Sequence, residues 1–191
     1  GVSCGGAWLS EDGGETWSLR TDGMYAGYMP PAQAKDGDIQ DPHRIAACAA
    51  NPDVLWCQHH TSAFRSDDAG ATWSELTALQ PSRFGFAVAA SPRDPGTAWF
   101  VPAVKDEERI PVDGKVVVAR TTDGGRSFEV FSKGLPQDSA YDLVYRHGLG
   151  VDDQGGALVM GSTSGSLWEA GDGGESWQVA SHHLPPIYCV R

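Results

Sequence analysis

The chain has 191 residues, a formal net charge of −11 and a sequence pI of about 4.8. This acidic balance argues against nucleic acid or an anionic membrane surface as a partner, and no apolar run approaches the roughly 20 residues of a membrane span. The composition is 40% hydrophobic with 24 Gly and 12 Pro, which is typical of many short strands joined by turns.

An eight-residue pattern recurs four times along the chain. It reads small or hydroxyl residue, any residue, Asp, small residue, Gly, any residue, Ser or Thr, and an aromatic residue. The copies occupy residues 10–17, 66–73, 121–128 and 170–177, and their aromatic positions are 56, 55 and 49 residues apart. A nearly constant period of this size indicates a repeat architecture.

Each copy contains the side chains that close a tight turn. The Asp carboxylate accepts hydrogen bonds from the backbone N–H groups that follow it, the Gly adopts a positive φ, and the Ser or Thr hydroxyl adds a second local bond. The alternative is a calcium loop, but an EF-hand needs alternating acidic ligands and a distal Glu. We therefore predict structural turns, with each aromatic residue packed under the next blade or sheet; the key residues are Asp12, Trp17, Asp68, Trp73, Asp123, Phe128, Asp172 and Trp177.

These turns resemble the Asp-box, or BNR repeat, of sialidases, other glycoside hydrolases, sortilin-type receptors and photosystem assembly factors. The copy at 66–73 fits every fixed position, while the third copy departs from the pattern at Phe128 and the fourth at Ala170. The resemblance covers the whole chain. It implies an all-β fold, a β-propeller of four-stranded antiparallel blades, with the boxes on the face opposite the active site in the enzymes that carry them.

In chain order, the approximate repeats are residues 1–20, 43–77, 84–131 and 143–181, and residues 186–191 resemble the inner strand of a closing blade. Propellers usually have four to eight blades, and about four fit in this chain. The first box begins too early for a complete blade before it. We therefore expect that a missing N-terminal part or a partner chain completes a larger propeller, for example one of seven blades. Targeting signals, and so the localisation, cannot be read.

The cysteines leave two alternatives open. Cys48 and Cys57 lie symmetrically about the predicted turn at residues 52–53, so they could form a cross-strand disulfide or remain as two buried thiols. No Cys-x-x-Cys spacing occurs, so a zinc site built on cysteines is not expected. No cofactor is predicted from the sequence.

The strand order of a propeller divides the loops between two faces. With strands A to D counted from the axis outward, the A–B and C–D turns share the face of the boxes, and the B–C and D–A loops share the other. We therefore expect His43 and His59 to lie on the face opposite Asp68 and Asp123. The long loop at 21–42 falls on the same face as the histidines, and long loops in compact domains are often functional.

Three kinds of site are compatible with this face. A glycosidase would use paired carboxylates, for which the candidates are Asp36, Asp38, Asp41, Asp106, Glu107 and Glu108. A metal or anion site would use histidines, and arginines could hold an anionic sugar. In the third interpretation the charges are solvated and the histidines make only local hydrogen bonds. The candidate ligand-binding residues are His43, Arg44, His59, His60, Arg83, Arg109, Tyr145, Arg146 and His147.

A closer resemblance is to bacterial BNR-repeat glycosyl hydrolases and exo-α-sialidase-like proteins. It rests on recurring phrases at residues 41–45, 58–60, 84–86, 120–125 and 183–186. The resemblance implies a sialidase-like propeller that binds or cleaves carbohydrate on the face opposite the boxes. The alternative is a non-catalytic scaffold, assembly-factor or protein-binding propeller.

Overall fold

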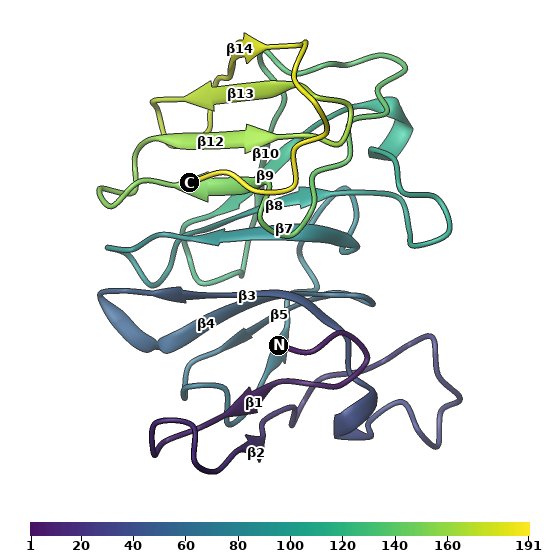
Figure 1. The fold of residues 1–191 in the computed structure, drawn as a ribbon, viewed down its shortest axis with the longest axis vertical. Helices are drawn as coiled ribbons and strands as arrows, with labels where there is room; N and C mark the ends of the chain where they lie inside the picture. Colours follow the sequence, from purple (N-terminus) through teal and green to yellow (C-terminus); the bar gives the residue numbers. More distant parts are fainter.

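The computed structural model describes residues 1–191 as four antiparallel sheets that follow one another along the chain (Figure 1). The first sheet has only two strands, β1 (Trp8–Leu9) and β2 (Ser18–Leu19). The other three have four strands each, in the chain order that the repeats predict. The predicted β-propeller fold is therefore confirmed, with three complete blades and one two-stranded sheet.

Each complete blade is a meander in which neighbouring strands are consecutive in the chain. The second sheet contains β3 (Pro42–Cys48), β4 (Asn51–His59), β5 (Ala63–Ser66) and β6 (Ser74–Glu75). The third contains β7 (Gly85–Ala90), β8 (Ala98–Pro102), β9 (Val118–Thr121) and β10 (Glu129–Phe131). The fourth contains β11 (Leu149–Val151), β12 (Leu158–Gly161), β13 (Leu167–Ala170) and β14 (Gln178–Ser181).

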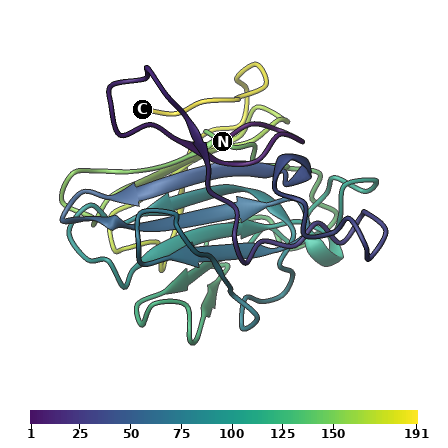
Figure 2. The ribbon, with the colours of Figure 1, turned by 90° about the horizontal axis from the view of Figure 1, so that it is seen from below.

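The helical content is limited to two single turns of 3₁₀-helix, η1 (Gly37–Ile39) and η2 (Val112–Gly114). Neither has the length or the apolar character that a membrane-crossing helix requires. Figure 2 shows the chain from below, with both termini on one side of the stacked sheets, the side of β3 and β11.

The core lies between the blades, where apolar side chains of one sheet meet those of the next. Trp56, Phe100 and Val88 pack between the second and third sheets, and Trp99 and Trp168 pack between the third and fourth. All residues of β7 and β8 are buried, because other sheets cover both faces of the third blade. This double burial explains the continuous apolar run in β8, where an alternating pattern would leave polar groups without partners.

The four box turns share two hydrogen bonds to the Asp carboxylate, one from a backbone N–H and one from a Ser or Thr hydroxyl. In the second copy, Asp68 accepts the N–H of Thr72 (2.8 Å) and the Thr72 hydroxyl (2.7 Å), and Ser66 donates its hydroxyl to the same carboxylate (2.8 Å). The carboxylates of Asp12, Asp123 and Asp172 accept the equivalent backbone and hydroxyl groups. These donors favour the ionised form and hold the pKa of Asp68 below its usual range.

The aromatic residue of the second box, Trp73, packs differently from our expectation. The indole N–H of Trp73 donates to the carbonyl of Arg20 (3.0 Å), and Gly23 approaches the Trp73 backbone so closely that a Cβ would overlap its carbonyl oxygen. Trp73 thus packs against the preceding repeat, not the following one. Trp17, which has no preceding repeat among residues 1–191, is 59% exposed.

We expect Asp68→Ala to lower the melting temperature while leaving ligand binding on the opposite face intact. The substitution removes the three hydrogen bonds that the Asp68 carboxylate accepts. Asp153→Ala is the matched control, because the exposed Asp153 side chain makes no hydrogen bond or ion pair. Thermal unfolding of both variants checks the prediction; equal melting temperatures would contradict it.

The cysteine alternatives are decided in favour of free thiols. Cys48 and Cys57 are both buried and unpaired. In the β3–β4 register, Cys57 lies opposite Ile45 and Cys48 lies opposite Asn51. The two residues are therefore not cross-strand neighbours, because the partner of Cys57 lies three residues before Cys48.

The C-terminal residues run beside the innermost strand of the last blade. Cys189 forms a single parallel bridge with His147, and the N–H of Val190 donates to the His147 carbonyl (2.9 Å). Residues 186–191 form no regular strand here. Their predicted role as the inner strand of a closing blade stays a prediction.

Candidate functional site

The candidate site lies at the ends of β3, β4 and β7 that point away from the box turns. In the β3–β4 register, Pro42 lies opposite His59 at one end, and Cys48 lies opposite Asn51 at the other. The box follows β5 at the second of these ends, where the N–H of Ala69 donates to the Asp53 carbonyl (2.9 Å). The prediction that His43 and His59 lie on the face opposite the box of their blade is confirmed.

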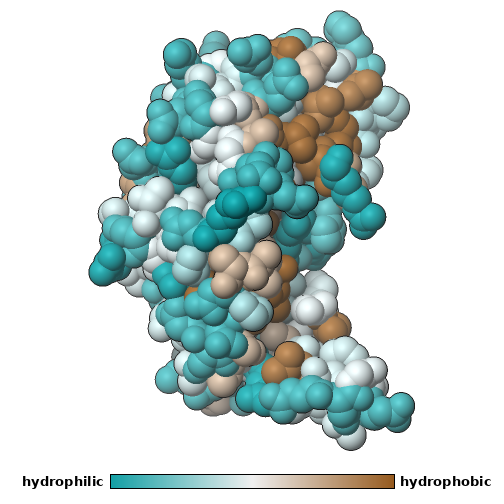
Figure 3. Space-filling view, turned by 90° about the vertical axis from the view of Figure 1, so that its left-hand side faces the viewer, coloured by the Kyte–Doolittle hydropathy of each residue, from teal (hydrophilic) through white to brown (hydrophobic).

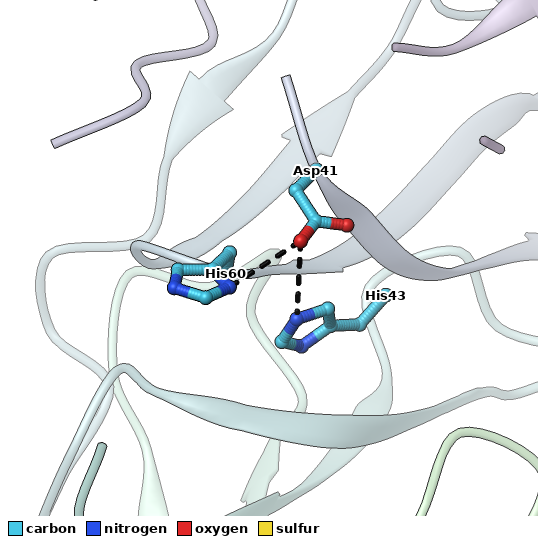
Figure 4. A group of neighbouring side chains, drawn as sticks. All are labelled: Asp41, His43 and His60. Carbon is cyan, nitrogen blue, oxygen red and sulfur yellow. Dashed lines mark ion pairs between the residues drawn. The ribbon is translucent and has the colours of Figure 1, made fainter. Parts of the chain in front are cut away.

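Asp41, His43 and His60 converge on one point of this face (Figure 4). Asp41 immediately precedes β3, and His60 immediately follows β4, so the antiparallel pairing places them side by side; the His60 N–H donates to the Asp41 carbonyl (2.9 Å). The Oδ2 atom of Asp41 lies 3.3 Å from Nδ1 of His60 and 3.8 Å from Nε2 of His43. One ligand atom from each residue lies within 4.8 Å of the other two, so these residues could hold a metal ion.

The His43 imidazole is held in one orientation and one tautomer. Its Nδ1–H donates to the carbonyl of Gly85 (2.7 Å), and its ring stacks on Phe86 with centroids 4.4 Å apart and planes at 11°. Burial lowers the pKa of His43 to about 4, against a weaker opposing effect of the Gly85 hydrogen bond and the Asp41 charge. His43 is therefore neutral at pH 7, and its free Nε2 lone pair faces Asp41.

His59 supports the site from below and is not available to a ligand. The ring is fully buried, its Nε2 receives the N–H of Asp41 (2.9 Å), and its Nδ1 faces the N–H of Thr61 (3.1 Å). A protonated ring has no lone pair to accept either bond, so the ring is neutral. Burial lowers its pKa to about 3. The candidate ligand-binding residue His59 thus positions Asp41.

Asp41 is a buried carboxylate that remains ionised. Burial alone would raise its pKa, but the Ser3 hydroxyl donates to Oδ1 (2.8 Å), and the N–H of Cys4 and the neighbouring His43 and His60 also favour the charged form. The net effect lowers the pKa of Asp41. A buried, ionised carboxylate beside two imidazoles can act as a base, a nucleophile or a metal ligand.

A second group of candidates surrounds the Phe86 ring. Tyr145 contacts it edge-on (centroids 5.0 Å apart), and the guanidinium groups of Arg109 and Arg146 lie 5.4 and 6.0 Å from its centroid. Arg44 lies farther along the inner strand, where it donates to the Arg146 carbonyl (2.7 Å) and to Nδ1 of His147 (2.9 Å). Burial and then the charge of Arg44 lower the pKa of His147.

A hollow of about 350 Å³ lies beside His60. Asp106 and Glu107 line it together with Arg83 and Lys105. The structure therefore brings two of the six candidate carboxylates, Asp106 and Glu107, next to His60. His60 in turn contacts a third candidate, Asp41. The remaining three lie elsewhere: Asp36 and Asp38 are exposed at η1, and Glu108 belongs to a turn outside the hollow.

Several residues of the site were not among the sequence candidates. Ser3 contacts Asp41 from 38 residues away, and the Tyr28 and Phe84 rings lie edge-on to His60 at 4.8 and 5.9 Å. Burial raises the pKa of Tyr28 to about 12. The position of Tyr28 in the long loop at 21–42 was the only signal for it, and no sequence pattern indicated Ser3.

A larger hollow of about 1140 Å³ lies on the concave side of the stacked blades. The inner strands β3, β7 and β11 line it through small residues such as Ala46, Ala89 and Gly150. Figure 3 shows the molecule curved around an indentation, with hydrophobic side chains gathered beside it. From these inner strands the hollow extends across the fourth blade, where Val159, Glu169 and Gln178 also line it.

The chain is similar in structure to propeller domains of much longer proteins. No family model and no curated protein sequence matches it. A GH74 xyloglucanase from Xanthomonas campestris matches 71% of this chain with 26% identity and a TM-score of 0.55, and an ancestral GH74 enzyme matches 93% with 14% identity and a TM-score of 0.67. YCF48 bound to D1 peptide matches 75% with 16% identity and a TM-score of 0.53.

This chain covers 20% and 21% of the two GH74 chains and 40% of the YCF48 chain. It thus spans well under half the length of the propeller proteins that it resembles. At these identities the likeness establishes the fold. We conclude that residues 1–191 form a partial β-propeller.

Proposed function

We propose that this propeller binds, or binds and cleaves, a carbohydrate on the face opposite the box turns. The observation that carries the proposal is the cluster around Phe86, where Tyr145, Arg109 and Arg146 meet beside the His43 ring. Binding sites for small ligands combine aromatic walls with a few placed polar groups, and arginines can hold the carboxylate of an acidic sugar through paired hydrogen bonds. The similarity to GH74 enzymes supports this proposal.

Cleavage would draw on the carboxylates next to His60. Asp41 is ionised and suits the part of base or nucleophile, while Glu107 at the rim of the hollow is the candidate for the acid, because Arg109 holds the neighbouring Asp106 in an ion pair. Glycosidases place two such groups roughly 5–10 Å apart. The finer assignment as a sialidase-like enzyme remains part of this proposal, and it rests on the sequence resemblance alone.

The test is binding of the full-length protein to an array of neutral and acidic glycans. We expect Arg109→Ala to weaken binding of an acidic glycan by about 10-fold or more, the usual cost of losing a hydrogen bond to a charged group. Arg126→Ala is the matched control, since Arg126 is equally cationic and exposed but lies in the third box turn. Equal losses in the two variants, or no binding to any glycan, would contradict the proposal.

A screen of chromogenic glycosides distinguishes cleavage from binding. We expect any turnover to fall by at least 10²-fold in Glu107→Gln, because general acid catalysis contributes about 10²–10⁴-fold. An unchanged rate would remove Glu107 from the mechanism. Binding without turnover across the panel would leave a carbohydrate-binding propeller.

The second candidate function is binding of a protein or peptide. Two tyrosines are unusually exposed on the same face, Tyr141 (72%) and Tyr188 (61%), and Tyr188 lies 5.8 Å from Tyr145. Exposed aromatic side chains are frequent in protein interfaces, and the similarity to YCF48 in its complex with a peptide supports this alternative. Absence of glycan binding together with retention of a peptide partner in pull-down experiments would favour it.

We also propose that further blades close the ring around the hollow of about 1140 Å³. They would belong to a longer form of this chain or to a partner chain. The exposed Trp17 supports this idea, since the equivalent Trp73 is covered by the preceding repeat. Small-angle X-ray scattering of the full-length protein is expected to fit a closed ring; a C-shaped particle would contradict it.

A further inference from the structure

We propose that Asp41, His43 and His60 form a binding site for a divalent transition-metal ion such as Zn²⁺. Three observations carry this inference: the separations of the ligand atoms, the hydrogen bonds that orient them, and the open side of the cluster. None of them depends on carbohydrate binding, so the inference stands or falls separately from the proposed function.

The separations fit one small cation. Zinc binds imidazole nitrogen and carboxylate oxygen at about 2.0–2.2 Å, so two ligand atoms of a tetrahedral site lie about 3.3–3.6 Å apart. Oδ2 of Asp41 lies 3.3 Å from Nδ1 of His60 and 3.8 Å from Nε2 of His43, and all three atoms lie within 4.8 Å of one another. A shift of about 1 Å in the half-exposed His60 side chain would close the set.

The hydrogen bonds that His43 and Asp41 make to surrounding groups are typical of metal ligands. A ligating histidine almost always donates its second ring N–H to a carbonyl or carboxylate, which fixes the tautomer and points the free lone pair at the metal. His43 does so through Nδ1–H to the Gly85 carbonyl (2.7 Å), leaving Nε2 directed at Asp41. Asp41 receives the Ser3 hydroxyl on Oδ1 (2.8 Å), while its Oδ2 has only a weak donor besides the two imidazoles, the Cys4 thiol (3.7 Å). Figure 4 shows both rings directed at that oxygen.

The cluster is closed on one side and open on the other. His43 and Asp41 are buried, with side chains 2% and 7% exposed, while the His60 side chain is 23% exposed and borders the hollow of about 350 Å³. Catalytic zinc sites keep three protein ligands and leave a fourth position for water or substrate. The hollow supplies that position; Arg83 and Lys105 balance Asp106 and Glu107 on its wall, so the negative charge that attracts the cation is that of Asp41.

The ligand types select the class of metal. Imidazole nitrogens suit Zn²⁺, Fe²⁺, Cu²⁺ and Ni²⁺, whereas Ca²⁺ and Mg²⁺ prefer sites made only of oxygen ligands. His59 cannot contribute, because backbone N–H groups face both of its ring nitrogens. The proposed ligands are therefore two histidines and one carboxylate. The two buried ligands, Asp41 and His43, are already oriented by hydrogen bonds.

The experiment is calorimetric titration of Zn²⁺ into the chelator-treated chain, repeated with Co²⁺ and followed by visible absorption. We expect one equivalent to bind, and His60→Ala to weaken the affinity by at least about 10–100-fold, since loss of an outer hydrogen bond alone costs that much. The control is His183→Ala, which removes an exposed histidine on the same face without touching the cluster. We expect its affinity to match that of the unmodified protein.

Two results would overturn the inference: no stoichiometric binding, or equal affinity in the unmodified protein and in His60→Ala. A loss confined to His183→Ala would also overturn it, because the ion would then occupy the surface pair His182–His183. Ser3→Ala is the second variant if His60→Ala does not fold; it leaves all three ligands in place and is expected to weaken binding by about 10-fold or more.

Discussion

Acidification of the metal-free protein from pH 7 to pH 4 is expected to lower its free energy of unfolding by several kcal/mol. Two buried histidines cause this loss. Burial lowers the pKa of His43 to about 4 and that of His59 to about 3, from the ordinary value of 6.5. One pKa unit corresponds to about 1.4 kcal/mol, so the combined effect at pH 4 is on the order of 5 kcal/mol.

The direction follows from proton binding. Between about pH 4 and pH 6.5 the unfolded chain protonates both histidines while the folded protein keeps them neutral, so protons favour unfolding and stability rises with pH. The box aspartates affect the stability in a lower pH range. Their lowered pKa values stabilise the fold above the unfolded value of about 3.8, and this contribution is lost only at still lower pH.

Urea unfolding at several pH values between 4 and 7, with a chelator present, measures the effect. His59→Gln should flatten the pH dependence, because its amide oxygen can accept the Asp41 N–H without titrating. His183→Ala should leave the slope unchanged, since that histidine is exposed. A stability that is constant across this range would show that His43 and His59 are not held neutral by the fold.

Phe100→Ala is expected to lower the free energy of unfolding by about 3–5 kcal/mol, the usual cost of removing a buried phenylalanine ring. Phe100 is fully buried in β8, between the second and third blades. Its ring lies edge-on to Trp56 (6.3 Å between centroids) and to Phe128 (5.9 Å). The substitution leaves a cavity at the contact between two blades, where neighbouring sheets cannot collapse to fill it.

Urea unfolding at pH 7 checks this prediction, with Val130→Ala as the control. Val130 lies in the outer strand β10 of the same blade and is 45% exposed, so its truncation should change stability by about 0.5 kcal/mol or less. The Phe128 ring of the third box packs on Phe100, so the box aromatic should lose part of its support as well. Similar losses in Phe100→Ala and Val130→Ala would mean that the interblade core contributes little.

The box turns were predictable because every bond in them is local. The carboxylate of Asp68 reaches only residues 66 and 72, so an eight-residue pattern contains the whole structure. The period between copies then implied the blades. The direction in which the aromatic residues pack was wrong in the sequence analysis, because contact between Trp73 and residues 20–24 depends on how one sheet lies on another.

The candidate site was only partly predictable. Topology placed His43 and His59 on the face opposite the boxes correctly, because strand direction alternates in a meander. The same reasoning could not tell that His59 points into the core and His60 toward solvent. Side chains of neighbouring strand residues point to opposite sides, and the identity of the buried one depends on the register with β3 and β5.

The sequence by itself thus determined the repeat, the fold class and the face on which polar side chains gather, since these follow from short-range turns and strand order. Only the tertiary structure decided which of six carboxylates and nine candidate ligand residues meet. It joined Ser3 to Asp41, and it set His43 between Gly85 and Phe86 of the next blade. Such contacts come from the packing of separate blades, whose relative placement is a property of the whole core and not of any local pattern.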